Sequence, residues 1–230
     1  MNNSLANLSI VGGTGALGSA VAWRAARAGY NVTIGSRNQD KAQVAAQQIK
    51  SRLPATASIA GLDNAAAAQA AEIVFLTVPY ASHEQTLADI RDGVAGKILV
   101  DATVPLVPPR VASYQAPASG TAALRAKALL DDSTQVVSAL HNVAAHKLAE
   151  DIDVDCDVLV CGDSLDARQA VIDILAAIGL RGLHAGGLAN SAAAEALTSI
   201  LIGINKRYKV DGAGIRITGN LIPPEPQRGT

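Results

Sequence analysis

The sequence has few aromatic residues and no excess of charge of either sign. Phenylalanine, tryptophan and tyrosine make up 3% of the 230 residues, whereas 45 residues are alanine. Such a composition fills a core with closely packed small side chains, as in helix-rich α/β proteins. The 19 lysines and arginines are balanced by 20 aspartates and glutamates. This balance argues against proteins that coat nucleic acids or lie on membrane surfaces, because both need a basic face.

Long apolar runs and cysteine motifs are also missing. No run reaches the roughly 18 apolar residues of a membrane span, and the first residues lack the pattern of a secretory signal. Cys156 and Cys161 have neither Cys-x-x-Cys nor zinc-ligand spacing. We interpret them as reduced, small residues that flank a strand. The sequence therefore predicts a cytoplasmic protein with no bound metal and no nucleic-acid or membrane partner.

Short apolar runs alternate along the chain with alanine-rich segments. Most of the runs lack period-2 alternation, which indicates strands buried on both faces. Strands that alternate with helices predict an α/β fold with a doubly wound, mainly parallel sheet. The predicted strands are residues 8–11, 31–35, 58–61, 73–78, 97–101, 135–140, 158–162 and 182–185. The predicted helices are residues 16–28, 40–53, 64–71, 82–92, 120–130, 164–178 and 190–208.

The first predicted strand runs directly into the glycine-rich segment Gly12–Gly18, and a helix follows. A G-x-G-x-x-G pattern is weak evidence alone, but between a first strand and a helix it is the fingerprint of a dinucleotide-binding Rossmann fold. Gly13 allows the sharp turn, Gly15 leaves room for the pyrophosphate, and Gly18 lets the helix lie close to the sheet. The N–H groups that begin the helix then face the anion.

The end of the second predicted strand indicates which dinucleotide is bound. NAD-binding proteins usually carry an acidic residue there, about 20 residues after the glycines. This chain instead has Ser36 and Arg37, 21 and 22 residues after Gly15, with Lys41 nearby. A hydroxyl, a guanidinium and an ammonium group favour a 2′-phosphate. We therefore predict NADP(H), with Arg37 also placed to stack on the adenine.

Further candidate residues follow the fourth and fifth predicted strands, at the sheet edge where doubly wound proteins bind their ligands. Val78 and Tyr80 are expected to line the passage of the nicotinamide end, and Pro79 fixes the turn between them. Residues 101–105, which include Val104, are expected to form one wall of the same crevice. The proline-rich segment 104–120 that follows has the length of a loop that serves a site.

The segment His141-Asn142-Val143 follows the strand predicted at residues 135–140. We expect His141 to position a substrate rather than to act as an essential acid or base. His83 is interpreted as a residue of a helix N-terminus. The chain lacks the G-x-S-x-G, H-E-x-x-H, Walker and Tyr-x-x-x-Lys patterns. This absence favours a protein that holds two cofactors face to face and lets them react, without a catalytic side chain.

Taken in order, these motifs resemble those of the NADPH-dependent coenzyme F420 reductases, also called F420-dependent NADP oxidoreductases. The resemblance covers about residues 8–219. It is carried by residues 12–18, 34–37, 77–80, 101–105, 138–142, 161–163 and 211–219.

The resemblance implies reversible hydride transfer between NADP(H) and the deazaflavin F420, which is bound as a substrate. It implies that Thr14, Gly15, Ala16 and Leu17 hold the pyrophosphate, and that a second set of residues lines the deazaflavin side. That second set is His141, Asn142, Val143, Ala213 and Gly214.

These predictions divide the chain into an NADP-binding Rossmann domain at residues 1–140 and a smaller part at residues 141–222. The smaller part completes the sheet and the second-cofactor pocket, and residues 223–230 are predicted to be a disordered tail. We also expect a homodimer or a higher homo-oligomer. Two alternatives remain open from the sequence: an NADPH-dependent flavin (FMN or FAD) or metal reductase, and a non-catalytic sensor of NADP(H).

Overall fold

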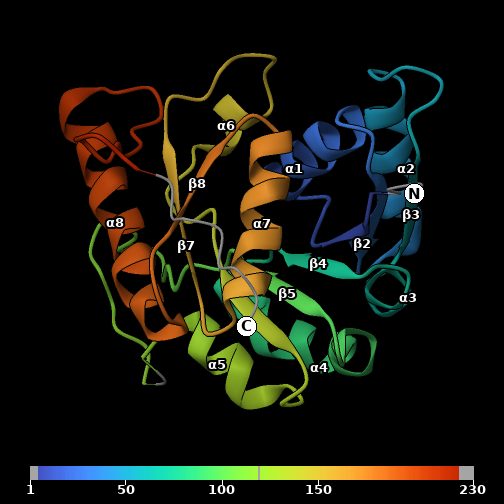
Figure 1. Cartoon of the computed structure of the whole chain (residues 1–230), viewed down its shortest axis with the longest axis horizontal. Coiled ribbons are helices and arrows are strands. Elements are labelled where there is room, and N and C mark those ends of the chain that lie inside the picture. The colour runs from blue at the N-terminus through green and yellow to red at the C-terminus, as the bar shows by residue number, and fades with distance from the viewer. Residues whose placement is uncertain (1–4, 119, 223–230) are drawn as a thin grey trace.

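The computed structural model describes residues 5–118 and 120–222, and its centre is one eight-stranded sheet (Figure 1). The strand order is β3-β2-β1-β4-β5-β6-β7-β8. All neighbouring strands are parallel except β6 and β7, which are antiparallel. This confirms the predicted mainly parallel, Rossmann-type sheet. The strands are β1 (Asn7–Val11), β2 (Asn31–Ser36), β3 (Ile59–Asp63), β4 (Ile73–Leu76), β5 (Ile98–Asp101), β6 (Gln135–Ser138), β7 (Asp157–Gly162) and β8 (Arg181–His184).

Helices cover both faces of the sheet and form two separate apolar layers. One core packs α1, α2 and α7 against the sheet, and the other packs α3, α4 and α5 against the opposite face. Alanines on these helices bring their backbones close to the strands, as the composition predicted. The helices are α1 (Ala16–Arg27), α2 (Gln39–Lys50), α3 (Asn64–Gln69), α4 (His83–Val94), α5 (Ala122–Leu129), α6 (Ala145–Leu148), α7 (Leu165–Ala177) and α8 (Ser191–Tyr208), with 3₁₀ turns η1 (Tyr80–Ser82) and η2 (Leu188–Asn190).

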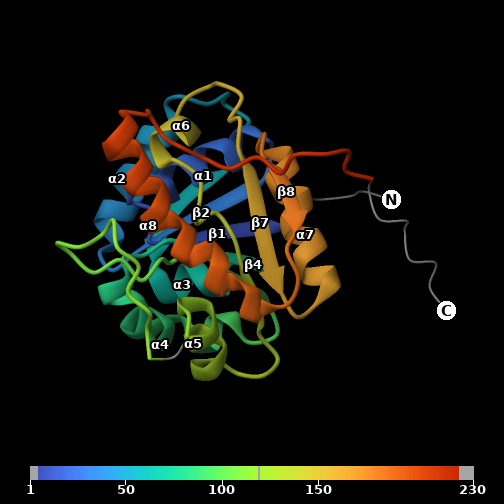
Figure 2. The same ribbon diagram turned by 90° about the vertical axis from the view of Figure 1, so that its left-hand side faces the viewer.

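The position of α8 matters for the site, because this helix crosses in front of the sheet in Figure 2. Thr198 of α8 donates from Oγ1 to the carbonyl oxygen of His141, which follows β6, at 2.7 Å. Glu195 of α8 accepts from the first N–H groups of α5. These bonds place α8 beside the carboxyl ends of β5 and β6, next to the point where the strand order reverses between β1 and β4.

The structure departs from the predicted elements in a few places. Strands β4 and β6 end two residues earlier than predicted, at Leu76 and Ser138. The chain turns away after β6 because Leu140 adopts a left-handed conformation, with φ at 71°. Cys161 lies within β7 rather than beside it, and both cysteines are free and buried. Helix α6 was not predicted, and the predicted disordered tail lies outside the described residues.

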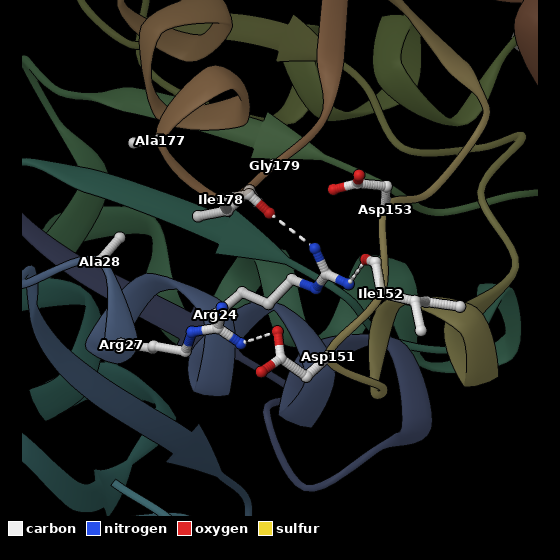
Figure 3. A pocket seen from close by; sticks show the side chains of 9 residues that line it. All are labelled: Arg24, Arg27, Ala28, Asp151, Ile152, Asp153, Ala177, Ile178 and Gly179. Atoms are coloured by element: carbon white, nitrogen blue, oxygen red, sulfur yellow. Dashed lines mark hydrogen bonds and ion pairs between the residues drawn. The ribbon is translucent and has the colours of Figure 1, made fainter. Parts of the chain in front are cut away.

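A large cavity lies at the far end of α1 from the glycine-rich loop (Figure 3). It measures about 480 Å³ and is bordered by Arg24 and Arg27 of α1, the loop at residues 151–153 and the end of α7. Arg24 is 8% exposed, and its guanidinium donates to the carbonyl oxygens of Leu148, Glu150, Ile152 and Ile178 at 2.7–3.0 Å. The guanidinium thereby ties α1 to two distant segments, which indicates a structural role.

Replacement of Arg24 by methionine should lower the free energy of unfolding by about 2 kcal/mol, because buried carbonyl groups lose charged donors. Urea unfolding of the two proteins measures the difference. Arg27 is a matched control on the same helix, because its ion pair with Asp151 is exposed to solvent. Arg27→Met should therefore change the stability by less than about 1 kcal/mol. Equal losses in the two variants would contradict the structural role of Arg24.

Candidate functional site

The glycine-rich loop joins β1 to α1 and has the close packing that a dinucleotide-binding turn requires. Gly12 has a φ of +79°, and its N–H donates to the carbonyl oxygen of Gly35 on β2 at 3.1 Å. A Cβ atom on Gly18 would lie 2.5 Å from Thr77 Oγ1 and 2.7 Å from the Gly13 Cα. These contacts explain why the positions of Gly12 and Gly18 demand glycine for the fold itself.

Gly15 differs from its neighbours because the space beside it is open. A Cβ atom there would meet only the Gly12 carbonyl oxygen, at an ordinary 3.4 Å. Gly15 is the N-cap of α1, no side chain caps this helix end, and the first turn holds no acidic residue. The first N–H groups of α1 therefore remain available to an anion that approaches over Gly15.

The end of β2 carries the polar corner that the sequence predicted. Ser36 is the last residue of β2 and accepts the N–H of Asn38 on its Oγ at 3.2 Å. The side chains of Arg37 and Lys41 are exposed, and neither makes a hydrogen bond or ion pair with any residue that the structure describes. Two cations without a protein counter-ion beside a hydroxyl form an arrangement suited to a phosphate.

A cavity of about 410 Å³ connects the glycine-rich loop, this corner and the end of β4. Of the predicted cofactor residues, it brings together Thr14, Gly15, Ser36, Arg37, Lys41, Val78 and Pro79. Gly13, Ala16, Leu17, Gly18, Tyr80 and Val104 do not line it.

The cavity is also lined by residues that the sequence did not assign to the cofactor, including Asn38, Asn64 and Thr77. Asn64 is 5% exposed, and its Oδ1 has no hydrogen-bond partner among the described residues. Its position immediately after β3, at the carboxyl edge of the sheet, is the sequence signal that could have identified it.

The turn after β6 holds the predicted second-substrate residues, and it is more deeply buried than expected. His141 is 4% exposed, and neither ring nitrogen has a hydrogen-bond partner among the residues described. Burial lowers the pKa of His141 to about 4, so the imidazole is neutral at physiological pH. Asn142 is 3% exposed and donates from Nδ2 to the Asp157 carbonyl oxygen at 2.6 Å. The amide of Asn142 therefore fixes the turn to β7.

The C-terminal segment reaches this turn through Cys156. Gly214 packs against the Cys156 sulfur, since a Cβ atom there would lie 2.7 Å from Sγ, and Asn142 Nδ2 lies 3.2 Å from the same atom. Ala213 is held to α8 by its N–H, which donates to Asn205 Oδ1 at 2.7 Å. The structure thus brings Ala213 and Gly214 close to Asn142, although these residues are more than 70 positions apart in the chain.

A group of buried ionisable residues lies at the carboxyl end of β5, where the sequence predicted one wall of the crevice. His83 Nε2 lies 2.7 Å from Asp101 Oδ2, and both side chains are fully buried. Burial lowers the pKa of His83, but the hydrogen bond and charge of Asp101 outweigh that effect and raise it overall. Burial raises the pKa of Glu195 to about 7. His83 does begin a helix, as interpreted from the sequence, but its side chain faces inward to Asp101.

Comparison with known proteins identifies the family. Residues 7–105 match the model of the family described as NADP oxidoreductase, coenzyme F420-dependent. The chain is 39% identical over 220 residues to the F420-dependent NADP reductase of Methanocaldococcus jannaschii, an alignment that covers 92% of this chain and 97% of the relative. The chain belongs to this family.

Other relatives agree with this assignment. The F420-dependent NADP reductase of Methanothermobacter thermautotrophicus is 40% identical over 218 residues, with 92% of this chain and 94% of the relative covered. The fold is shared with a crystal structure from Arthrobacter sp. FB24 of a protein with a proposed F420-dependent NADP reductase activity, with a TM-score of 0.78 at 23% identity. That alignment covers 94% of this chain and 100% of the other.

No group of histidine, cysteine, aspartate and glutamate side chains in the described part is arranged to hold a metal ion. Within residues 5–118 and 120–222, no helix has the length and apolar character needed to cross a membrane.

Proposed function

We propose that this protein transfers a hydride between NADP(H) and coenzyme F420. The observation that carries the proposal is the near-complete alignment, at about 40% identity, with curated F420-dependent NADP reductases. The site supports the NADP(H) half independently, because the open position at Gly15 and the unpaired cations of Arg37 and Lys41 lie along one cavity. This combination fits a dinucleotide that carries a 2′-phosphate.

We assign the residues to the two ligands as the sequence predicted. The dinucleotide is held by Gly13, Thr14, Gly15, Ala16, Leu17, Gly18, Ser36, Arg37, Lys41, Val78, Pro79, Tyr80 and Val104. The deazaflavin is held by His141, Asn142, Val143, Ala213 and Gly214. In this assignment residues 1–140 form the NADP-binding part and residues 141–222 complete the second pocket. We further propose that the protein acts in the cytoplasm as a homodimer or higher homo-oligomer.

The proposed mechanism requires the protein to align two ligands rather than to supply a nucleophile. NADP(H) and the deazaflavin, when bound, would supply the hydride donor and the hydride acceptor, and the residues assigned above would hold their reacting ends in contact. The glycine-rich loop fixes the pyrophosphate, and the corner at the end of β2 fixes the adenosine end. Asn142 and Thr198 hold the turn at His141 in place from β7 and α8. The residues thereby accelerate the reaction by orienting the two ligands, since the reaction needs no covalent bond to the protein.

A spectrophotometric panel tests this proposal. We expect NADPH absorbance to fall when oxidised deazaflavin is added, and we expect NADH to react far more slowly. FMN and FAD serve as competing acceptors in the same assay. Faster turnover with FMN or FAD would favour the flavin reductase alternative. Tight NADPH binding with no turnover of any acceptor would favour the NADP(H) sensor.

A further inference from the structure

His83 and Glu195 have no part in the roles assigned above, and Asp101 was expected only as part of one wall of the crevice. His83 begins α4, Asp101 ends β5, and Glu195 lies in the first half of α8; their exposures are 0%, 0% and 1%. Asp101 accepts from His83 Nε2 at 2.7 Å on Oδ2 and from the Thr103 N–H at 2.9 Å on Oδ1. The bond between His83 and Asp101 thus joins α4 to β5, and Glu195 of α8 lies within electrostatic range of both side chains.

Glu195 is anchored so that its carboxyl group cannot turn to solvent. Oε2 accepts the Ala122 N–H at 2.9 Å, and Oε1 accepts the Ala123 N–H at 3.2 Å, at the start of α5. Burial of an ionised carboxylate is costly even with these donors. The group therefore has a reason to hold a proton near neutral pH.

Charged groups on every neighbouring element act on this site. Glu195 is within electrostatic range of Asp101 on β5, of His83 on α4 and of Cys161 on β7. Glu84 acts on His83 from the solvent side and is itself paired with Arg125 of α5 at 2.9 Å. Burial raises the pKa of Glu195 to about 7, and Asp101 raises the pKa of His83. The charge of each group acts on the other, so the protonation of Glu195 is linked to the protonation of His83.

We propose that His83, Asp101 and Glu195 form a buried proton-holding site that exchanges the proton accompanying hydride transfer. The inference rests on the proposed function. When NADPH reduces the deazaflavin, the nicotinamide C4–H bond breaks with its electron pair and a C5–H bond forms on the deazaflavin. One proton is taken up at deazaflavin N1, and NADP⁺ is released. The site gives up that proton and regains it from water, and the reverse reaction returns a proton to the site.

His141 lies in the turn after β6, among the residues that we assign to the deazaflavin pocket. Its ring is within electrostatic range of Asp101 and lies against the Thr103 backbone, which also favours the protonated ring, while no side chain among the described residues bonds either ring nitrogen. A neutral imidazole can accept a proton at one nitrogen and release one from the other. Ser138, opposite Asp101 in the β5–β6 register, and Thr103 also carry buried hydroxyl groups without a partner in the described part of the chain. We place the proposed proton path along these polar atoms.

The dependence of kcat on pH, measured in both directions with Glu195→Gln, tests the proposal. In the unmodified protein, kcat for deazaflavin reduction should fall as the pH rises through about 7, because Glu195 then loses its proton. The reverse reaction should show the opposite trend. Glutamine retains an oxygen for an α5 N–H but does not titrate. We expect Glu195→Gln to remove this fall of kcat with rising pH. The variant should also lower kcat for deazaflavin reduction about tenfold or more at low pH, with KM for NADPH unchanged.

Two further variants separate this role from a structural one. Glu84→Gln removes an exposed carboxylate that also faces His83, and its pH profile should match the unmodified protein because water screens its charge. His83→Gln can still donate to Asp101 but carries no charge, and because the charge of His83 lowers the pKa of Glu195, this variant should move the fall in kcat to higher pH. It keeps the test valid if Glu195→Gln does not fold.

Histidine-ring NMR of the ligand-free protein provides a readout without turnover. The His83 ring should titrate above its ordinary pKa, and Glu195→Gln should lower that value more than Glu84→Gln does. If Glu195→Gln turns over with the same pH profile as the unmodified protein, and the pKa of its His83 ring is unchanged, the proposed proton site is wrong. An unmodified protein that binds both ligands without turnover would instead overturn the proposed function, and the proton role with it.

Discussion

Substitution of Gly15 by valine should weaken the binding of NADPH and NADH alike while leaving the fold intact. The backbone at Gly15 has φ −80° and ψ 167°, an extended conformation that valine adopts readily. A Cβ atom there meets no protein atom closer than 3.4 Å. The substitution therefore fills the space in which we place the pyrophosphate, and it should change the free energy of unfolding little.

The expected loss is about 3 kcal/mol or more, at least about 150-fold in Kd, because two or more charge-assisted bonds to the helix N–H groups are lost. Fluorescence titration with each nucleotide measures the loss, and thermal unfolding checks the fold. An undiminished affinity for NADPH would place the pyrophosphate elsewhere.

Gly18→Ala is the matched control, because it alters the other side of the same turn. The new Cβ atom would lie 2.7 Å from the Gly13 Cα and 2.8 Å from the Gly12 carbonyl oxygen, and backbone atoms cannot move away cheaply. We expect a loss of stability of about 1–3 kcal/mol from overpacking. The pair of variants thus separates a glycine required by the proposed ligand from a glycine required by the fold.

The sequence predicted the parts of the molecule that depend on local pattern. The glycine-rich turn and the corner at Ser36 and Arg37 each occupy a few consecutive residues between a strand and a helix, so spacing alone places them. Apolar runs and alanine-rich segments indicated the order of strands and helices for the same reason. Whether the assigned residues bind the two ligands stays a prediction.

The features that the sequence did not reveal depend on contacts between distant segments. The α5 N-terminus is held by Glu195, which is 73 and 72 residues from Ala122 and Ala123. His83 looked like an ordinary first residue of a helix, because nothing near it in the chain indicates that it faces Asp101. The antiparallel pairing of β6 with β7 likewise follows from a long connection that reverses the chain. No periodic pattern of apolar residues in the sequence indicates that reversal.

Replacement of Arg37 by alanine should raise KM for NADPH about 10- to 150-fold, since a lost contact between a guanidinium and a phosphate costs about 1.5–3 kcal/mol. KM for NADH should change little, because NADH has no 2′-phosphate for this side chain to bind. The Arg37 side chain is exposed and has no partner among the described residues, so its removal should leave the fold undisturbed.

Steady-state kinetics with the two nucleotides, each against the same acceptor, measure the selectivity of Arg37→Ala directly. Arg91→Ala is the control, because this exposed arginine lies on α4 and does not line the cavity at the end of β2. It should leave both KM values unchanged. If Arg37→Ala instead weakened NADPH and NADH equally, the guanidinium would be acting on the adenine or the pyrophosphate, which the two nucleotides share. Discrimination at the ribose would then have to come from Ser36 and Lys41, the two other polar side chains of this corner.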